Sequence, residues 1–411
     1  MDNNIKVFWN CLAFSCFTIT IFFLFRQYPL LNYSSIMNVS CLLFIIFIAF
    51  FIKRGIFTSG LFGFFLIFLS VHGLYSLYSG NDPVLILRFY IIIALIIVSY
   101  YAAIKSISYI NIFIFLAVTQ AFVIIGLEAF MFLNFRFSDY SVIRNYFIDN
   151  HFGDIYTYNG FFYHIQIKGN ALLLFSYMVS FYLYNKTNCK LYLLSSILLV
   201  VAVLFCGNLA FYIVFIIHAF IFFFLRKANT YNQLLLKVFI CLITFGAFIS
   251  YSGMEYLVKA YELKFQGANF SSMGTRFDQF NVLIDDLFEN VLTALVGQGL
   301  GNLINVQTAV RNYSDYIYYE LQSVYFLNQL GVLLFLLFVI INVILTLKFI
   351  KPIELRIVYM LYVLYALVNP YMLDTNHVVV VFILVSLSSI FSKGGDCYYN
   401  GKKHISSYNY I

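Results

Sequence analysis

Long apolar runs recur along this 411-residue chain, and they limit its fold more than any other feature of the sequence. Each run is about 17 to 25 residues long, which as an α-helix is enough to cross a hydrocarbon layer of roughly 30 Å. The runs are continuous and lack the alternation of polar and apolar residues that a membrane β-barrel requires. We therefore predict an all-α, polytopic membrane protein in which residues 1–411 form a single integral membrane domain.

The composition of the chain agrees with this prediction. Hydrophobic residues make up 63% of the chain and aromatic residues 21%, whereas charged residues make up only 10%. Soluble domains carry about 25% charged residues. Because a water-soluble core of this length cannot enclose 50 Phe and 35 Tyr, most of the chain must face lipid or other helices.

We predict about twelve transmembrane helices joined by short connections, except at two long polar segments. The predicted spans are residues 6–25, 36–52, 56–78, 84–104, 108–134, 170–185, 190–206, 208–225, 234–252, 322–348, 354–373 and 376–392. The long loops are about 135–169 and 253–321, and residues 393–411 form a polar tail. The first span is followed by "RQYPLLNY", which has no small-residue cleavage site, so we expect the span to be retained. We find no internal repeat and no inverted pair of broken helices of the kind that marks many transporters.

The positions of the basic residues predict the orientation. With the N-terminus inside, fifteen of the 24 basic residues fall on cytoplasmic segments: Lys6, Lys53, Arg54, Lys105, Lys186, Lys190, Arg226, Lys227, Lys237, Lys348, Lys351, Arg356, Lys393, Lys402 and Lys403. Only Arg26 and Arg88 fall in or beside short outer loops. Since short cytoplasmic loops carry the excess of Lys and Arg, we predict that both termini are cytoplasmic and that both long loops face outward. The net charge of +7 reflects these loops, and we expect no nucleic-acid partner.

The cysteines indicate neither a disulfide framework nor a zinc site. All seven lie in or beside predicted spans or in the tail, and no C-x-x-C motif occurs: Cys11, Cys16, Cys41, Cys189, Cys206, Cys241 and Cys397. No other metal or cofactor constellation is visible in the sequence, so we expect none.

The second long loop contains a predicted amphipathic helix at residues 277–295, "FDQFNVLIDDLFENVLTAL". Its apolar residues recur at i, i+3 and i+4 spacing, with acids on the other face: Phe277, Phe280, Leu283, Ile284, Leu287, Phe288, Val291 and Leu295. The helix would lie on the outer leaflet or over the bundle, and the simpler interpretation is that it only closes the top of the protein. Gly274-Thr275-Arg276 stands at or just ahead of its start, where free N–H groups and a guanidinium together suit a phosphate.

Two further features follow that helix. The stretch "GQGLGN" at 297–302 resembles a phosphate loop, with Gly297 and Gly299 as contacts, but no lysine follows it, and the alternative is a helix-ending turn. Glu320 stands at the mouth of the tenth predicted span, where it is either a solvated boundary residue or a functional carboxylate. Arg311, between them, is a further candidate for binding substrate.

The first long loop combines basic residues with many aromatic residues. The basic candidates are Arg136, Arg144, His151, His164 and Lys168. Such a mixture suits sugar rings and phosphates, and it equally suits a loop that lies against lipid headgroups. Arg88 lies a turn inside the fourth predicted span, where a charge is costly unless it is paired or serves a ligand.

The order of these motifs resembles that of the bacterial Wzy-type O-antigen polymerases and the related O-antigen ligases. The matching elements are "GTR" at 274–276, "GQGLG" at 297–301 and "ELQSVYFLNQLG" at 320–331. The layout of ten to fourteen spans with two large outer loops also matches. The ligases typically open the last motif with a histidine, whereas this chain has Glu320, which favours a polymerase over a ligase.

The resemblance implies a metal-independent glycosyltransferase of lipopolysaccharide biosynthesis in the bacterial inner membrane. Members of this family take a growing glycan from undecaprenyl diphosphate and join it to a sugar hydroxyl of the next lipid-linked repeat unit. A flippase and a chain-length regulator are the protein partners that this role implies, beside the membrane lipid. The reaction requires positive charge on the diphosphate and a base near the attacking hydroxyl. The candidates for these roles are Arg276, Arg144, Arg88, Lys168 and Arg311 for the diphosphate, and Glu320, with His164 behind it, for the base.

Three alternatives remain beside the polymerase. A ligase of the same fold is one of them. A flippase for lipid-linked oligosaccharides would have a similar number of spans, but short loops and charges inside its central spans are expected. A small-solute transporter should show broken helices and buried carboxylates, whereas the predicted spans contain little beyond Glu128, Arg88 and His218.

Overall fold

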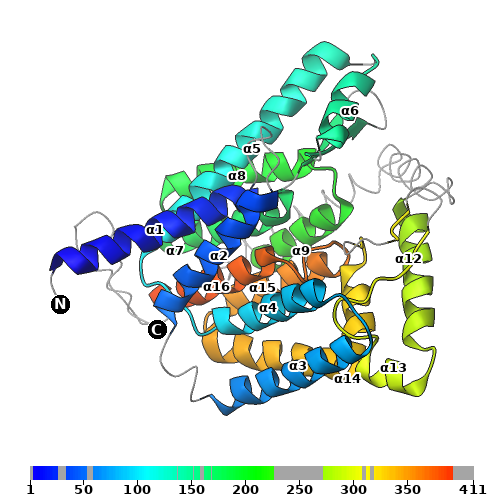
Figure 1. The fold of residues 1–411 in the computed structure, drawn as a ribbon. Helices are drawn as coiled ribbons and strands as arrows, with labels where there is room; N and C mark the ends of the chain where they lie inside the picture. The colour runs from blue at the N-terminus through cyan, green and yellow to red at the C-terminus, as the bar shows by residue number, and fades with distance from the viewer. Residues whose placement is uncertain are drawn as a thin grey trace.

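The computed structural model is a bundle of long helices with a two-stranded sheet at one end (Figure 1). The structure describes residues 3–25, 34–52, 59–136, 138–150, 152–157, 162–167, 169–225, 272–307, 312–314 and 319–391. The predicted features that lie outside these described residues include the span 234–252, His151, Lys168, Arg311 and the tail 393–411.

Each predicted span that falls on described residues corresponds to one helix of the bundle. These helices are α1 (Asn3–Phe25), α2 (Ser34–Phe51), α3 (Gly60–Tyr78), α4 (Pro83–Ser99), α5 (Ile107–Phe135), α7 (Leu173–Thr187), α8 (Lys190–Phe205), α9 (Leu209–Leu225), α14 (Gln322–Phe349), α15 (Ile353–Leu367) and α16 (Thr375–Phe391). The bounds agree with the prediction to within a few residues, except that α4 ends at Ser99 and not at residue 104, and α15 ends at Leu367 and not at residue 373. The residues after Leu367 form a turn that contributes to the candidate site described below.

Four helices among the described residues are long and apolar enough to cross a membrane: Val7–Phe25, Gly60–Tyr78, Ile107–Phe135 and Gln322–Phe349. Shorter apolar helices accompany them, at Pro83–Ser99, Lys190–Phe205, Leu209–Phe222 and Thr375–Phe391. The outer surfaces of the long helices are also apolar, since Leu74 of α3 and Phe115 of α5 are each 67% exposed. A helix that is hydrophobic all round suits contact with lipid, so the structure is that of a helical protein suited to a membrane.

Contacts between residues at the helix termini show which termini lie together at each end of the bundle. One end, here called the α12 end, carries α12 (Ser272–Leu287) and α13 (Val291–Val296), at the right of Figure 1. Its contacts join Asn81 to residues Gln298 and Leu300, Asn208 to Asn369, and Tyr365 to Ala171. The contacts of the opposite end join Ile52 to Ala102, Ile104 to Ser386, Lys351 to Ser388, and Lys186 to Glu354. Successive helices therefore alternate in direction, as membrane spans with short connections must.

The first long loop folds into α6 (Ser141–Asp149) and a hairpin of β1 (Gly153–Thr157) and β2 (Tyr163–Ile167). The strands are antiparallel, with Ile155 opposite Ile165. The hairpin is attached to α5 through Glu128, whose carboxylate oxygens accept hydrogen bonds from the Tyr163 amide at 3.1 and 3.2 Å. The short helix η2 (Asn170–Leu172) then leads into α7. Glu128, one of the few acids within the predicted spans, therefore has a structural role.

The amphipathic helix predicted at 277–295 is divided into two helices, so the prediction of one helix was wrong. Helix α12 ends at Leu287, and α13 starts anew at Val291. Asn290 starts α13 with a capping box, because its side chain accepts from the Thr293 amide at 2.9 Å while its own amide donates to the Thr293 hydroxyl. Such a reciprocal cap satisfies free helix donors and favours a new helix start.

The face of α12 that packs on the bundle also differs from the predicted apolar face. Thr275, Gln279, Leu283 and Leu287 are buried at i, i+4 spacing, whereas Phe277 is 59% exposed. The buried stripe thus places a glutamine, Gln279, inside the contact between α12 and the bundle.

Helix α14 is broken, although the sequence predicted a continuous span. Gly331 has φ 69° and ψ 171°, which are not helical, and it lies against Gly297 after the end of α13. A Cβ on Gly331 would lie 2.3 Å from the Gly297 nitrogen, and a Cβ on Gly297 would lie 2.4 Å from the Gly331 nitrogen. Both positions therefore require glycine, for the positive φ and for the close approach of the two backbones.

Candidate functional site

Arg276 and Glu320 form an ion pair at the α12 end of the bundle. Arg276 lies in the second turn of α12, and Glu320 lies just before α14 begins at Gln322. Arg276 Nε is 3.0 Å from Glu320 Oε2, and the two side chains are 30% and 34% exposed. The structure thus brings together the two residues that the sequence analysis singled out as diphosphate clamp and base.

The chain around Glu320 is held by contacts with two other elements. Gln279 of α12 accepts a hydrogen bond through Oε1 from the Leu321 amide at 3.3 Å. Gln322 accepts through Oε1 from the Leu373 amide at 3.1 Å. The position of Glu320 is therefore determined jointly by α12, by the start of α14 and by the turn that precedes α16.

That turn, residues 368–374 between α15 and α16, is joined to the start of α14 by the hydrogen bond between Leu373 and Gln322. Desolvation raises the pKa of the Tyr371 phenol, and the positive charge of Arg276 acts in the opposite direction. Asp374 accepts a hydrogen bond through Oδ1 from the Thr375 amide at 2.7 Å, at the start of α16. The charge of Arg276 therefore reaches the phenol in this turn, and Asp374 caps the helix that follows it.

His164, on β2, belongs to the same end of the bundle. Its ring centroid is 5.2 Å from that of Tyr156, and a Cβ on Gly207 would lie 2.1 Å from its Nδ1. Next to Gly207, the Asn208 side chain donates to Asn369 Oδ1 at 3.0 Å. These contacts connect His164 to the turn of residues 368–374.

Arg144 is engaged in a two-point ion pair with Asp154. Its Nε and Nη2 donate to Oδ1 and Oδ2 at 2.8 and 2.9 Å. These hydrogen bonds are the main reason that the pKa of Arg144 is raised. The pair fastens α6 to β1, so its donors on that side of the guanidinium are already used within the loop.

The loop of residues 297–302 uses its own amides within the protein. The Gln298 and Gly299 amides donate to the Asn328 and Gln329 carbonyls, the Leu300 amide to Ser76 Oγ, and the Gly301 amide to Gln329 Oε1, at 2.9, 3.1, 2.8 and 3.4 Å. Because these N–H groups are occupied, the structure does not support Gly297 and Gly299 as a phosphate loop. The alternative given by the sequence, a helix-ending turn, describes them, since α13 ends at Val296 and Gly297 follows with φ 83°.

The remaining candidates are not gathered at the ion pair by any contact that the structure describes. Arg88 is an exposed residue of α4. Lys168 and Arg311 lie outside the described residues.

Sequence reasoning missed Gln279, which holds the Glu320 segment, and Tyr371, whose phenol responds to the charge of Arg276. Gln279 could have been found from its spacing, because it follows Arg276 by three positions at the start of the predicted helix, a spacing that places two helical residues on one face. Tyr371 had no such signal, since it lay inside a predicted span. Among the described residues, no group of three or more His, Cys, Asp or Glu side chains could hold a metal ion.

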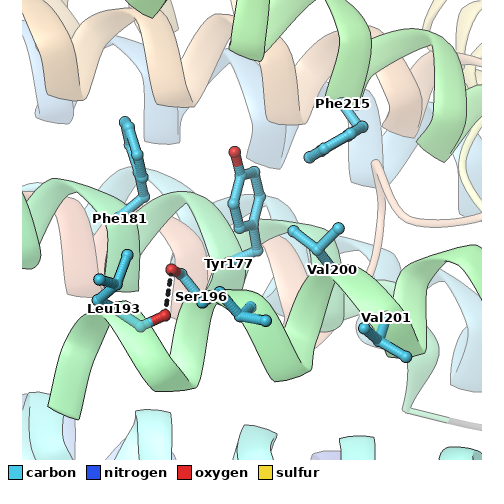
Figure 2. Close-up of a pocket in the computed structure, with 8 residues that line it drawn as sticks. Tyr177, Phe181, Leu193, Ser196, Val200, Val201 and Phe215 are labelled. Carbon is cyan, nitrogen blue, oxygen red and sulfur yellow. Dashed lines mark hydrogen bonds between the residues drawn. The ribbon is translucent and has the colours of Figure 1, made fainter. Parts of the chain in front are cut away.

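A cavity of about 270 Å³ lies elsewhere, between α7, α8 and α9 (Figure 2). Tyr177 and Phe181 of α7 face Leu193 and Val200 of α8 across it. The Ser196 hydroxyl donates to the Leu193 carbonyl at 2.7 Å, so it is occupied within its own helix. The lining suits a hydrocarbon and not an ionic substrate. The ion pair is therefore the better candidate for a reactive site.

Comparison with protein-family models, with curated proteins and with solved structures finds no match to this chain.

Proposed function

We propose that this chain is a polysaccharide polymerase of the Wzy type in the bacterial inner membrane, acting on lipid-linked repeat units at its outer face. The observation that carries the proposal is the ion pair between Arg276 and Glu320. The two residues come from the two motifs that resemble those of the family, and they are also the groups that the reaction needs.

The proposed orientation places the α12 end outside, with about twelve spans and both termini cytoplasmic. The distribution of basic residues supports it, because Lys186, Lys351 and Lys190 belong to the opposite end of the bundle. A diphosphate-linked glycan carried by an outer-leaflet lipid would then meet Arg276 and Glu320 directly.

In the proposed reaction, the hydroxyl of the acceptor sugar attacks the anomeric carbon of the donor glycan. A new C–O glycosidic bond forms while the bond between that carbon and the diphosphate oxygen breaks, and the electron pair leaves on the diphosphate. Glu320 takes the proton of the attacking hydroxyl. Arg276 stabilises the leaving diphosphate, because a guanidinium stays charged and binds phosphate oxygens at two points.

The ion pair implies an order of events for this reaction. Glu320 is paired with Arg276 before the substrate arrives, so the carboxylate and the guanidinium neutralise each other's charge. A diphosphate carries more charge than a carboxylate and replaces it on the guanidinium. Glu320 is released as a base at the moment when the donor is in place.

A transporter is the alternative that one observation favours, because broken helices mark many transporter sites and α14 is broken at Gly331. In transporters the backbone groups that such a break frees bind the solute. Here the carbonyls of Asn328 and Gln329 accept from the amides of Gln298 and Gly299, so the protein itself uses them. The break in α14 therefore does not favour a transporter over a polymerase.

Deletion of the gene followed by gel analysis of the surface glycan tests the proposal. A polymerase mutant should show lipid core that carries a single repeat unit, and the unaltered gene should restore the ladder of longer chains. Core that carries no repeat unit would contradict the proposal and indicate a ligase or a flippase.

A further inference from the structure

The contact between α12 and the Glu320 segment contains two hydrogen-bond donors that the structure leaves unused. Arg276 Nε is buried, and although it lies 3.0 Å from Glu320 Oε2, it is not aligned to donate to any acceptor among the described residues. Gln279 Nε2 is also buried and has no acceptor in the part of the chain that the structure describes, on a side chain that is 0% exposed. Buried donors without acceptors are rare in native proteins, and each one calls for an explanation.

The orientation of the Gln279 amide is determined by its surroundings. Its Oε1 accepts from the Leu321 amide at 3.3 Å. The reverse orientation would place an NH₂ group against that N–H donor, which is unfavourable. Nε2 is therefore the free end of the amide, and it carries two hydrogens.

The two unused donors lie close together. Arg276 and Gln279 are separated by one helical turn, which places their side chains on the same face of α12. They contact consecutive residues, since Arg276 meets Glu320 and Gln279 meets Leu321. A cation with a spare N–H and an amide with a spare NH₂, beside a carboxylate that is one-third exposed, form a site for an anion that displaces the carboxylate.

We infer that Gln279 is a binding residue of this site, and that its side-chain NH₂ donates to the same diphosphate that Arg276 holds. This inference rests on the proposed function and deepens it. Gln279 supplies a neutral donor from the buried wall of the site, Arg276 supplies the charge from the open side, and Glu320 moves aside. The glutamine also accepts a hydrogen bond from the Leu321 amide, so binding of the anion affects the residue next to Glu320.

The test uses purified full-length protein, with inorganic pyrophosphate as the probe and calorimetry as the measurement. Gln279→Glu keeps the size of the side chain and the acceptor for Leu321, but replaces the NH₂ donor with a carboxylate oxygen. We expect it to weaken pyrophosphate binding at least about tenfold, the effect of losing one hydrogen bond to a charged group. Gln279→Met removes the same donor without adding charge and should weaken binding about tenfold.

Asn281→Asp is the matched control, because it makes the same change from amide to carboxylate on the exposed face of the same helix. Pyrophosphate affinity within about twofold of the unaltered protein is expected for it, since a solvated charge is screened. Gel filtration and circular dichroism establish that each variant is folded. If Gln279→Glu does not fold, Gln279→Met decides the question.

Arg276→Ala separates the two proposals. Loss of binding in Arg276→Ala together with normal binding in both Gln279 variants overturns the inference and leaves the proposed function standing. Weakened binding in Arg276→Ala and in the Gln279 variants, in a protein whose deletion does not shorten the surface glycan, overturns the proposed function and leaves the anion site. Unaltered protein that binds no pyrophosphate, or Arg276→Ala that binds it normally, overturns the site as a whole.

Discussion

Arg276 and Glu320 have opposite charges and, in the proposed reaction, separate tasks. The resting contact between them joins Nε to one carboxylate oxygen, at the partly exposed edge of α12. A pair this exposed contributes little to stability, typically below about 1 kcal/mol. Its two members can therefore be changed one at a time, with effects that report on activity more than on folding.

Replacing Arg276 with lysine should abolish most polymerisation. Lysine keeps the charge but offers a point charge in place of the planar donor pair that a diphosphate requires. Polymer length on gels, in a deletion strain that expresses each variant at matched level, measures this. Arg356→Lys is the control, because Arg356 lies at the opposite end of the bundle, where its Nε and Nη2 donate to the Ile350 and Leu347 carbonyls at 2.6 and 3.0 Å. Normal chain length in Arg276→Lys would return Arg276 to a structural role.

Replacing Glu320 with glutamine should reduce polymerisation by about a hundredfold or more, since the amide cannot take a proton. Pyrophosphate binding should be retained or become severalfold tighter, because the competing carboxylate is gone from Arg276. The combination of lost polymer and retained binding separates the base from the clamp. Wild-type polymer from Glu320→Gln would exclude Glu320 as the base, and His164 would be the next residue to test.

At the scale of elements, the α12 end is organised by the break in α14. The carbonyls that the break at Gly331 frees are taken by the loop that follows α13, and Asn328 Nδ2 donates to the Leu283 carbonyl at 3.0 Å and to Asp286 Oδ2 at 2.8 Å. The helix that carries Arg276 and the helix that follows Glu320 are thereby joined two turns away from the ion pair. The distance between Arg276 and Glu320 depends on this junction.

Gly331→Ala should destabilise the protein by at least about 2 kcal/mol, because alanine at a positive φ is strained and its Cβ would lie 2.3 Å from the Gly297 nitrogen. Gly126→Ala is the matched control, since Gly126 lies in α5 and a Cβ there meets nothing within 4 Å. That change should be neutral or stabilising by up to about 1 kcal/mol. Thermal unfolding in detergent compares the two, and equal unfolding temperatures would mean that the break adapts to a side chain.

At the scale of the whole molecule, the two ends of the bundle differ in what they carry. The α12 end holds the small helices, the hairpin and the ion pair, whereas the opposite end holds Lys186 paired with Glu354 at 2.9 Å. The lysine–glutamate pair joins α7 to α15 at the end of the bundle that the charge distribution predicts to be cytoplasmic. Function and orientation are therefore linked, since an outward-facing site requires the α12 end to be outside.

Cysteine labelling tests that orientation. A cysteine at Gln307 should react with a membrane-impermeant thiol reagent in intact cells, whereas a cysteine at Lys190, at the opposite end of the bundle, should react only after lysis. Both positions are exposed in the structure, so access to either depends on the side of the membrane. Labelling is compared with that of protein without an added cysteine. Reaction at Lys190 in intact cells would reverse the topology.

The amino-acid sequence by itself determined which segments are helices of the bundle, because an apolar run is a local property that its own residues specify. The helix α5, at Ile107–Phe135, agrees with the predicted 108–134, and α16, at Thr375–Phe391, agrees with 376–392. Motif order also selected Arg276 and Glu320, although it gave no distance between them.

Only the tertiary structure decided how distant segments meet. Three features each depend on a partner elsewhere in the chain: the break at Gly331, the division of α12 from α13 and the turn after Leu367. No local pattern in the sequence predicts them. The same is true of the Arg276–Glu320 contact and of the unused amide of Gln279, whose burial follows from the packing of α12 on the start of α14. Local hydrophobicity places a helix in a membrane, whereas the pairing of side chains across helices is fixed by packing that the whole chain creates.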